Sequence, residues 1–293
     1  MADLESLLEK AEIVLQKLEA ILPALPAEPD WSAIAWRWQH QNGRGYLQAV
    51  LHPHQIRLKD LHHLDDQKDE IVRNTEQFVL GLPANNVLLT GARGTGKSSL
   101  VKALLTEFAE QGLRLVEVEK QDLHALPEIV DLIRNRSERF IVFCDDLSFE
   151  AGEPGYKALK VVLDGTLAAT SDNVLVYATS NRRHLLPEYM SENLETRHLG
   201  EEIRPGDSTE EKISLSERFG LWLSFYAFDQ EQYLKIAQSW LADYGVAQWD
   251  DGTRRAALQF SLARGARSGR VAYQFARDYA GKLALSVVKK SKG

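Results

Sequence analysis

The sequence predicts an α/β protein, in which a parallel sheet flanked by helices is followed by a small all-α region. Three observations support this fold class. Short apolar runs alternate with segments of helical spacing between Asn86 and Asn181, which is typical of a parallel sheet with crossover helices. One of these runs leads through a glycine-rich turn into a helix. After Phe228 the strand pattern ends and helical segments follow.

The first 55 residues are expected to form a helical extension. Residues 4–21 place apolar side chains at helical spacing, and the proline-rich stretch LPALPAEPD, residues 22–30, follows as a linker. Three tryptophans come next, at positions 31, 36 and 38. Clustered aromatic residues more often pack on a neighbouring domain than bind a partner, so we expect these tryptophans to pack on the main domain.

Residues 56–228 are expected to form the α/β core. Val87 to Leu89 form a short apolar strand, a helix follows over residues 97–111, and Gly112 stands where a C-terminal cap belongs. The run FIVFC, residues 140–144, is apolar throughout, as expected of a strand that is covered on both faces. The other predicted strands and helices are LRLVEVE (113–119), a helix over 122–136, RFIVFCDD (139–146), a helix over 155–168 and NVLVYATSN (173–181).

Residues 229–293 are expected to form a helical lid. Asp229 is a typical N-cap, and Gly245 ends the first helix. Two further helices are predicted near residues 253–264 and 268–285. The apolar face of the first helix consists of Tyr233, Ile236, Ala237, Trp240, Leu241 and Tyr244.

The segment NNVLLTGARGTGKSSL contains a complete P-loop, with Gly91, four residues, and then Gly96, Lys97 and Ser98. It follows a predicted strand and opens a predicted helix, and this context makes the pattern specific. The glycines permit backbone angles at which several N–H groups converge on phosphate. We expect Lys97 to reach the β- and γ-phosphates of ATP and Ser98 to ligate Mg²⁺. The predicted phosphate-binding residues are Gly91, Ala92, Arg93, Gly94, Thr95, Gly96, Lys97, Ser98 and Ser99.

Polar side chains end two of the predicted strands. Asp145 is the candidate for Mg²⁺, acting through a water molecule, because a metal beside the P-loop serine needs a carboxylate from an adjacent strand end. Asp146 is the candidate that orients or activates the attacking water, and the polar strand-end residues Thr179, Ser180 and Asn181 are candidates to hold that water. The alternative is an ordinary Asp-Asp turn, with Thr and Asn as common loop residues.

Taken in order, the P-loop, the Asp pair, ATSN, SLSERFGL and RGARSGR resemble an AAA+ ATPase over most of the chain. The chain looks closest to a group of predicted bacterial AAA+ ATPases of unassigned role. Its Asp-Asp form is similar to replication initiators, helicase loaders and transposition helpers. The resemblance implies that Asn181 is a first sensor and that Arg218 is an arginine finger for the ATP of a neighbouring subunit. It also implies that Arg270 is a second sensor, reaching the γ-phosphate from the lid.

The resemblance further implies an ATPase that acts as a homo-oligomer, in a ring or spiral such as a hexamer, and that remodels or loads a macromolecular partner. Leu61 and Leu64 match the segment that borders the adenine. Asp146 departs from the family pattern, because many AAA+ proteins carry Glu there. Since Asp is one methylene shorter, we expect looser water positioning and slow or partner-stimulated hydrolysis. The loop EVEKQDLHALP lacks the aromatic-apolar-glycine tip of threading unfoldases, which argues against protein unfolding.

Two other functional classes stay open. A nucleotide-switched binding module would use the same pocket with little turnover, and its rate would not depend on self-assembly. A P-loop small-molecule kinase is less favoured, because a kinase needs an acceptor site under an arginine-lined lid, and the helical lid with SGR fits an AAA+ protein better.

Charge and composition limit the partners. The net charge of −7 argues against a strongly basic nucleic-acid binder, yet residues 250–293 carry ten Lys and Arg against three Asp. This region is therefore +7 and the remainder −14. A solvated helical surface is the favoured interpretation, and nucleic-acid contact is the alternative. No signal peptide or membrane-length apolar run is found, and the single Cys144 lies in a predicted buried strand, so we expect a reducing, cytoplasmic location.

Overall fold

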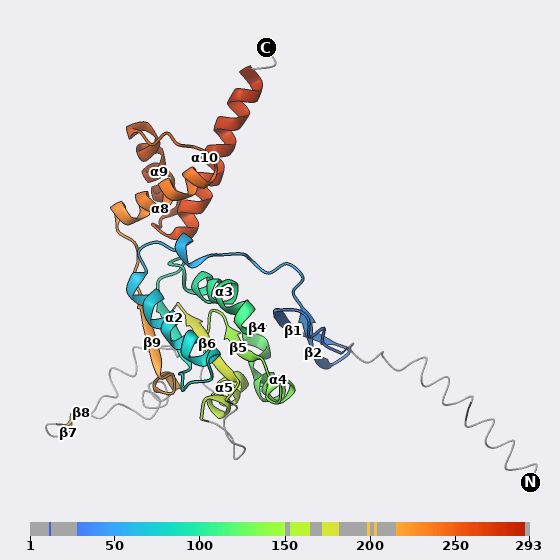
Figure 1. Cartoon of the computed structure of the whole chain (residues 1–293). Helices are drawn as coiled ribbons and strands as arrows, with labels where there is room; N and C mark the ends of the chain where they lie inside the picture. The colour runs from blue at the N-terminus through green and yellow to red at the C-terminus, as the bar shows by residue number, and fades with distance from the viewer. Residues whose placement is uncertain are drawn as a thin grey trace, which may run out of the picture.

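The computed structural model describes residues 12, 28–149, 153–164, 172–181, 198–199, 202–203 and 215–290 (Figure 1). Its centre is a seven-stranded sheet in the order β2-β1-β4-β5-β6-β3-β9. The strands of this sheet are β1 (Ala35–Gln41), β2 (Arg44–Ala49), β3 (Val87–Gly91), β4 (Leu113–Val118), β5 (Arg139–Cys144), β6 (Val174–Ser180) and β9 (Leu221–Phe225). A separate pair consists of β7 (His198–Leu199) and β8 (Glu202–Ile203).

Helices flank the sheet and form the C-terminal region. The α-helices are α2 (Asp65–Val79), α3 (Lys97–Phe108), α4 (Leu126–Ile133), α5 (Pro154–Asp164), α8 (Gln230–Asp243), α9 (Asp251–Arg264) and α10 (Gly269–Lys290). Three short 3₁₀ helices are η1 (Leu58–Asp60), η2 (Ala109–Gln111) and η3 (Lys120–Ala125). Within the described residues, none of these helices has both the length and the apolar character that crossing a membrane requires.

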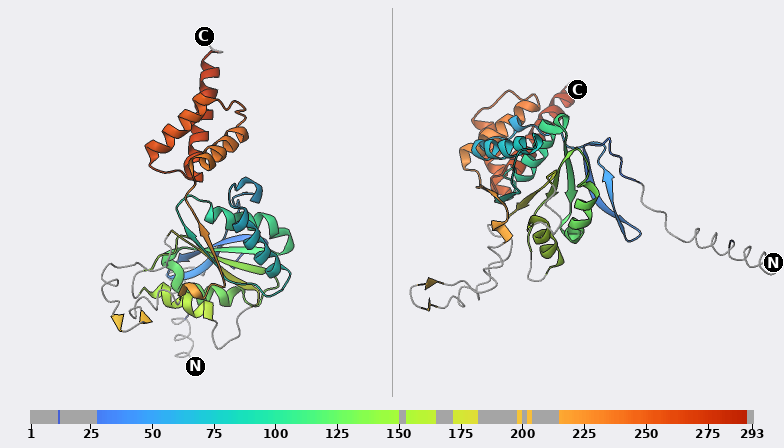
Figure 2. Two further views of the ribbon diagram at one scale, coloured as in Figure 1. Left: turned by 90° about the vertical axis from the view of Figure 1, so that its left-hand side faces the viewer. Right: turned by 60° about the horizontal axis from the view of Figure 1, so that its bottom comes forward.

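The sheet confirms the predicted α/β class, because every neighbouring pair of its strands except β1–β2 is parallel. Helices α2 and α3 cover one face, and α4 and α5 cover the other (Figure 2). This explains the apolar run of β5, where Phe140 and Val142 pack on one side and Ile141 and Phe143 on the other. Because these strands run the same way, the loops that follow β3, β5 and β6 meet at one edge of the sheet.

The N-terminal extension differs from the expectation of a helical region. Residues 35–49 form the antiparallel hairpin β1–β2, which joins the core sheet through parallel pairing of β1 with β4. The cause is local, since Asn42 and Gly43 adopt positive φ angles of 54° and 75°, as a two-residue hairpin turn requires. Trp36 and Trp38 alternate inward along β1 and are fully buried, which confirms that these two tryptophans pack on the core.

Most other described elements lie close to the predicted ones. The 3₁₀ extension of α3 ends before Gly112, whose φ of 95° is the left-handed cap conformation. Strand β9 is an element that the sequence pattern did not predict, and it pairs with β3 at the sheet edge. The helix predicted over residues 4–21 lies outside the described residues except for Glu12, and so do residues 165–168, the end of the helix predicted over residues 155–168.

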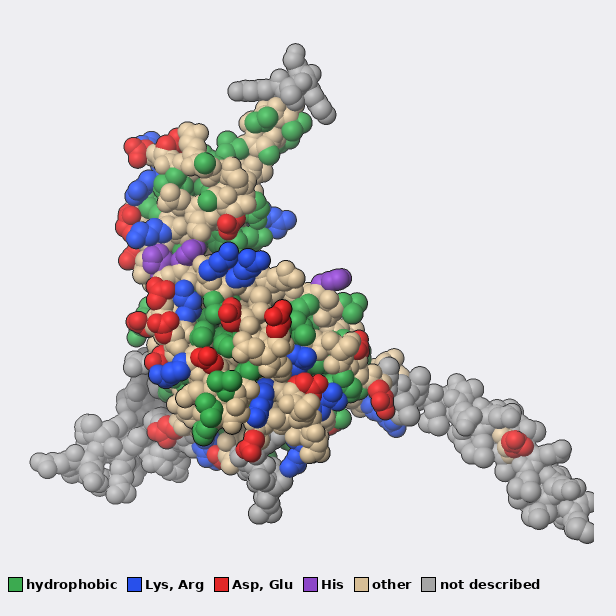
Figure 3. All heavy atoms as spheres, in the orientation of Figure 1, with side chains coloured by type: hydrophobic (Ala, Val, Ile, Leu, Met, Phe, Trp, Pro, Cys, Tyr) green, Lys and Arg blue, Asp and Glu red, His purple; other side chains and the backbone are tan. Residues whose placement is uncertain are grey.

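The lid consists of α8, α9 and α10, and the hinge of residues 226–229 connects it to β9. Asp229 and Asp250 start α8 and α9 as N-caps, each accepting at 2.8 Å from the backbone N–H three residues later. Histidine side chains lie at the junction of lid and core (Figure 3). One of the contacts between core and lid is that of His62, whose Nε2 lies 2.9 Å from Ser239 Oγ of α8. The lid is thus joined to the core by this contact as well as by the hinge.

Candidate functional site

The glycines of the P-loop have the conformations that its pattern predicts. Gly91, Gly94 and Gly96 adopt positive φ angles of 127°, 74° and 100°, which other residues disfavour. A Cβ atom at Gly91 would lie 1.9 Å from the carbonyl oxygen of Phe225, so β9 packs too closely for a side chain there. Gly96 precedes α3, so the first N–H groups of that helix face the loop. The other predicted loop residues, Ala92, Arg93, Thr95 and Ser99, lie in the loop or in the first turn of α3.

The Lys97 ammonium is held inside the loop. It donates to the carbonyl oxygens of Gly91 and Ala92 at 2.7 and 2.8 Å and to Oδ1 of Asn181 at 3.1 Å. Burial lowers the pKa of Lys97 to about 8, and the carboxylates of the neighbouring Asp pair act in the opposite direction. A phosphate beside this ammonium would favour its charged form, because opposite charges stabilise each other.

Ser98 and Asp145 lie together, as a Mg²⁺ site at this position requires. Ser98 Oγ donates to Asp145 Oδ1 at 2.6 Å, and Thr179 Oγ1 donates to the same oxygen at 2.6 Å. Hydroxyl and carboxylate oxygens are the ligands that Mg²⁺ prefers, so this donor set fits the metal. The fold brings the three side chains together because α3 begins, and β5 and β6 end, at the same edge of the sheet.

Asp146 and Asn181 form a second pair beside the first. Asn181 Nδ2 donates to Asp146 Oδ1, and the Oδ1 of the same amide accepts from Lys97. Asp146 has a φ of 52°, and its N–H donates to Thr179 Oγ1 at 2.9 Å. The guanidinium of Arg93 lies 4.0 Å from Asp146 Oδ2. These contacts orient Asp146 toward the P-loop even though its side chain is short.

The lid contacts the P-loop directly. The N–H of Gly269, at the start of α10, donates to the carbonyl oxygen of Gly94 at 2.8 Å. A Cβ atom at Gly94 would meet Ser268 Oγ and Cβ at 2.8 and 2.9 Å, and would lie 3.6 Å from Arg270 Cβ. The side chain of Arg270 is exposed, and its Cβ atom therefore lies beside the P-loop. Sequence reasoning missed Ser268 and Gly269, although both lie in the same SGR stretch as Arg270.

Leu61 and Leu64, predicted to border the adenine, also approach the loop. A Cβ atom at Gly96 would lie 3.0 Å from Leu64 and 3.9 Å from Leu61. Arg218 lies elsewhere, because its Nε forms an ion pair with Asp164 at the end of α5. The arrangement brings the other predicted groups to one edge of the sheet and holds Arg218 against α5. Asp164 is a further residue that sequence reasoning missed.

The family model described as "Protein of unknown function (DUF815)" matches residues 31–283. The chain belongs to this family. The hairpin β1–β2, the core and the lid up to the middle of α10 all lie within the match. No curated protein matches the chain in sequence.

Among solved structures, the chain is similar to RuvB of Thermotoga maritima, the Holliday junction branch migration motor, with a TM-score of 0.54 and 15% identity. Two variants of RuvB give TM-scores of 0.53 at 15% identity. These matches cover 80%, 78% and 80% of this chain and 66%, 65% and 66% of the RuvB chains. The chain thus spans slightly less than two thirds of the RuvB length. The likeness shows that the fold is the AAA+ fold.

Proposed function

We propose that the protein is an AAA+ ATPase that binds Mg²⁺ and ATP, and that it hydrolyses ATP as an oligomer to remodel or load a macromolecular partner. The observation that carries this proposal is the connected set of polar side chains behind the P-loop. Ser98 meets Asp145, and Asn181 joins Lys97 to Asp146. A glycine-rich turn with a purely structural role would need neither set of contacts.

The chemistry follows from the charge of the substrate. The N–H groups of the P-loop and the Lys97 ammonium would bind the β- and γ-phosphates. Ser98 and Asp145 would hold Mg²⁺, which neutralises phosphate charge when it is bound. Asp146, oriented by Asn181, would hold the attacking water in line with the γ-phosphate.

Assembly belongs to the proposal because of the position of Arg218. Its ion pair is with Asp164 of α5, so within one chain the guanidinium is held apart from the Lys97 group. An arginine supplied by a neighbour stabilises charge on the transferred phosphoryl group and is worth about 10³ or more in rate. Hydrolysis would then require a second subunit, which suits a machine that works only when assembled.

The test is the steady-state ATPase rate per subunit, measured against protein concentration for the wild type and Arg218→Ala. We expect the specific rate to rise with concentration and to fall by about 10³ in Arg218→Ala, with unchanged affinity for a fluorescent ATP analogue. Arg254→Ala is the matched control, because Arg254 is a partly exposed arginine paired with Glu231 within the lid. Equal losses of binding and turnover in Arg218→Ala would mean that Arg218 is structural or acts within its own subunit.

A nucleotide-switched binding module is the second candidate. The ion pair between Arg218 and Asp164 favours it, because this pair occupies the arginine that rapid hydrolysis would need. In such a module, ATP would set the position of the lid through its contact at Gly94, and the lid would select the partner. The rate would then be low, independent of protein concentration and insensitive to Arg218→Ala.

A further inference from the structure

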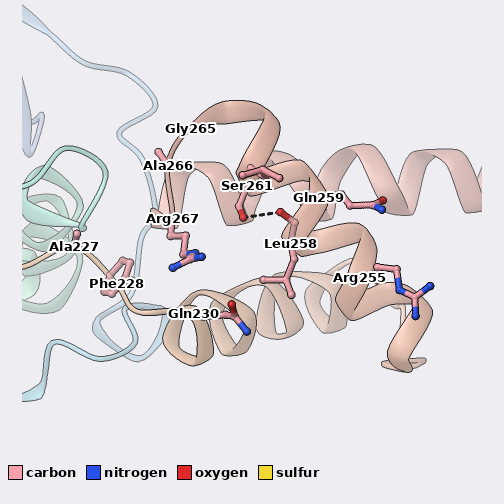
Figure 4. A pocket seen from close by; sticks show the side chains of 11 residues that line it. Ala227, Phe228, Gln230, Arg255, Leu258, Gln259, Ser261, Gly265, Ala266 and Arg267 are labelled. Carbon is pink, nitrogen blue, oxygen red and sulfur yellow. Dashed lines mark hydrogen bonds between the residues drawn. The ribbon is translucent and has the colours of Figure 1, made fainter.

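The lid carries a hollow that is separate from the nucleotide site. It lies between the hinge, the start of α8, the outer part of α9 and the loop before α10, and its volume is about 580 Å³ (Figure 4). This volume is within the range of about 300–1,000 Å³ that is typical of binding pockets. Neither a P-loop residue nor an η1 residue lines it. Its lining residues are Ala227, Phe228, Gln230, Arg255, Leu258, Gln259, Ser261, Leu262, Gly265, Ala266 and Arg267.

The hollow combines an apolar floor with two guanidinium groups. Phe228, Leu258 and Leu262 supply apolar surface, and Leu262 is 83% exposed. Figure 4 shows Leu258 between Arg267 at one end and Arg255 at the other. Both arginines are exposed, and neither has an ion-pair partner among the residues that the structure describes. A fitting ligand would therefore present apolar side chains next to carboxylates.

The N-terminal segment of the chain has this chemistry. Between residues 4 and 18, apolar residues recur at spacings of three and four, which predicts one apolar stripe along a helix. Glu5, Glu12 and Glu19 recur every seven residues and therefore border that stripe on one side. Residues 1–21 carry five acidic and two basic side chains, whereas residues 250–293 carry a net charge of +7.

The topology of the sheet favours an N-terminal segment from another copy, and not that of the same chain, as the occupant of the hollow. The chain enters at the start of β1, whereas the lid follows the end of β9, which is five strand positions away in a parallel sheet. Five spacings of about 4.8 Å and a rise of about 20 Å along the strands separate these points by roughly 30 Å. The nine linker residues 22–30 span about 30–32 Å when fully extended at ~3.3–3.6 Å per residue, so even a straight path would leave them no slack. They would also have to pass the helices that cover both faces of the sheet.

We propose that the hollow binds the amphipathic N-terminal segment, residues 4–21, of a second copy of this chain. The site would link assembly to nucleotide, because Ala266 and Arg267 immediately precede Ser268 and Gly269, which contact the P-loop at Gly94. The proposal names the partner contact for the oligomer in the proposed function. The link between assembly and nucleotide rests on the proposed function. The binding of the N-terminal segment to the hollow can be tested without ATP hydrolysis.

Photocrosslinking in the full chain identifies the occupant. A photoreactive benzoylphenylalanine replaces Leu262 in an unlabelled chain, which is mixed with an equal amount of ¹⁵N-labelled wild type and irradiated. Mass spectrometry is expected to find crosslinks from position 262 to residues 1–27 of the ¹⁵N-labelled copy. Some crosslinks will join two unlabelled copies, but N-terminal crosslinks confined to unlabelled peptides would mean binding within one copy and would overturn the proposal. Crosslinks to another segment of either copy, or to co-purifying nucleic acid, would also overturn it.

Charge reversal tests the electrostatic part. Arg255→Glu combined with Arg267→Glu should weaken self-association about tenfold or more in sedimentation velocity, because like charges would then face each other. Adding Glu5→Arg, Glu12→Arg and Glu19→Arg should restore it. Arg277→Glu, an exposed lid residue outside the hollow, is the matched control and should leave association unchanged. Unchanged association in the reversed variant, or no restoration, would overturn the proposal.

Failure of this proposal can be separated from failure of the proposed function. Affinity for a fluorescent ATP analogue is measured on each variant at a protein concentration where the chain is monomeric, and should there be unchanged by charge reversal, since the hollow contains no P-loop residue. If the chain hydrolyses ATP but charge reversal leaves its self-association unchanged, the docking site alone is overturned. If charge reversal weakens self-association and the restoring substitutions recover it, but the chain has no ATPase activity, the proposed function alone is overturned.

Discussion

The contact between Gly94 and Ser268 allows the packing of lid on P-loop to be measured. Replacing Gly94 by alanine would place a Cβ atom 2.8 Å from Ser268 Oγ and 2.9 Å from Ser268 Cβ. The new residue would also adopt a φ of 74°, which costs an L-residue about 1–2 kcal/mol. Overpacking adds about 1–3 kcal/mol. We therefore expect Gly94→Ala to lower the free energy of unfolding by about 2–5 kcal/mol.

Two further variants separate these costs. Gly245→Ala is the matched control for backbone strain, because Gly245 has a φ of 76° and a Cβ there meets nothing within 4 Å. Ser268→Gly removes both atoms that a Cβ at Gly94 would strike, and glycine at this N-cap of α10 costs about 0.3 kcal/mol. In Gly94→Ala/Ser268→Gly the overpacking disappears, so the loss should fall to about 1–2 kcal/mol.

Equilibrium unfolding in denaturant measures these variants together with the wild type. If the losses of Gly94→Ala and Ser268→Gly add in the double variant, the two residues are not in contact and the lid does not pack on the P-loop. A nucleotide titration on the same proteins links packing to function. Because the Cβ atom of Arg270 lies beside Gly94, we expect Gly94→Ala to weaken binding of a fluorescent ATP analogue. Adding Ser268→Gly to that variant should restore part of the affinity.

Three other perturbations have defined outcomes. Lys97→Ala should abolish tight binding of ATP in an equilibrium titration, and unchanged affinity would refute the assignment of the phosphate site. Burial raises the pKa of Cys144 to about 12, so about one thiol in 10⁴ is ionised at pH 8, and a thiol reagent should label the denatured but not the native chain. Rapid stoichiometric labelling of the native chain would contradict the burial of β5. Gly45→Ala would place a Cβ 1.9 Å from the Trp38 ring and should lower stability by about 1–3 kcal/mol; an unchanged denaturant midpoint would argue against the hairpin packing.

The P-loop could be predicted from the sequence because its determinants are adjacent along the chain. The apolar strand, the glycines with positive φ and the helix that starts at Lys97 all fall within one short segment. The cap at Gly112 and the N-cap at Asp229 are local in the same way. The hairpin β1–β2 was predictable too, since Asn42-Gly43 between alternating inward and outward residues is a strong turn signal.

The contacts of the lid could not be predicted in this manner. Gly94 and Ser268 are far apart in sequence, and their contact depends on how α10 packs against the loop after β3. Neither residue has a property that marks it as a partner of the other. The ion pair between Arg218 and Asp164 has the same character, because it depends on the relative position of α5 and the segment before β9.

Asp146 shows why a motif position has to be judged with its neighbours. The shorter side chain predicts looser positioning of water than Glu would give. In the structure, however, Asn181 donates to its carboxylate, Thr179 accepts from its N–H, and its φ of 52° turns it toward the P-loop. A carboxylate held by these contacts has little conformational freedom. The short length of the Asp146 side chain, and not its mobility, would therefore limit how well it positions the water. Because the same amide of Asn181 also binds Lys97, a phosphate that draws the ammonium forward would change the support of Asp146 at the same time.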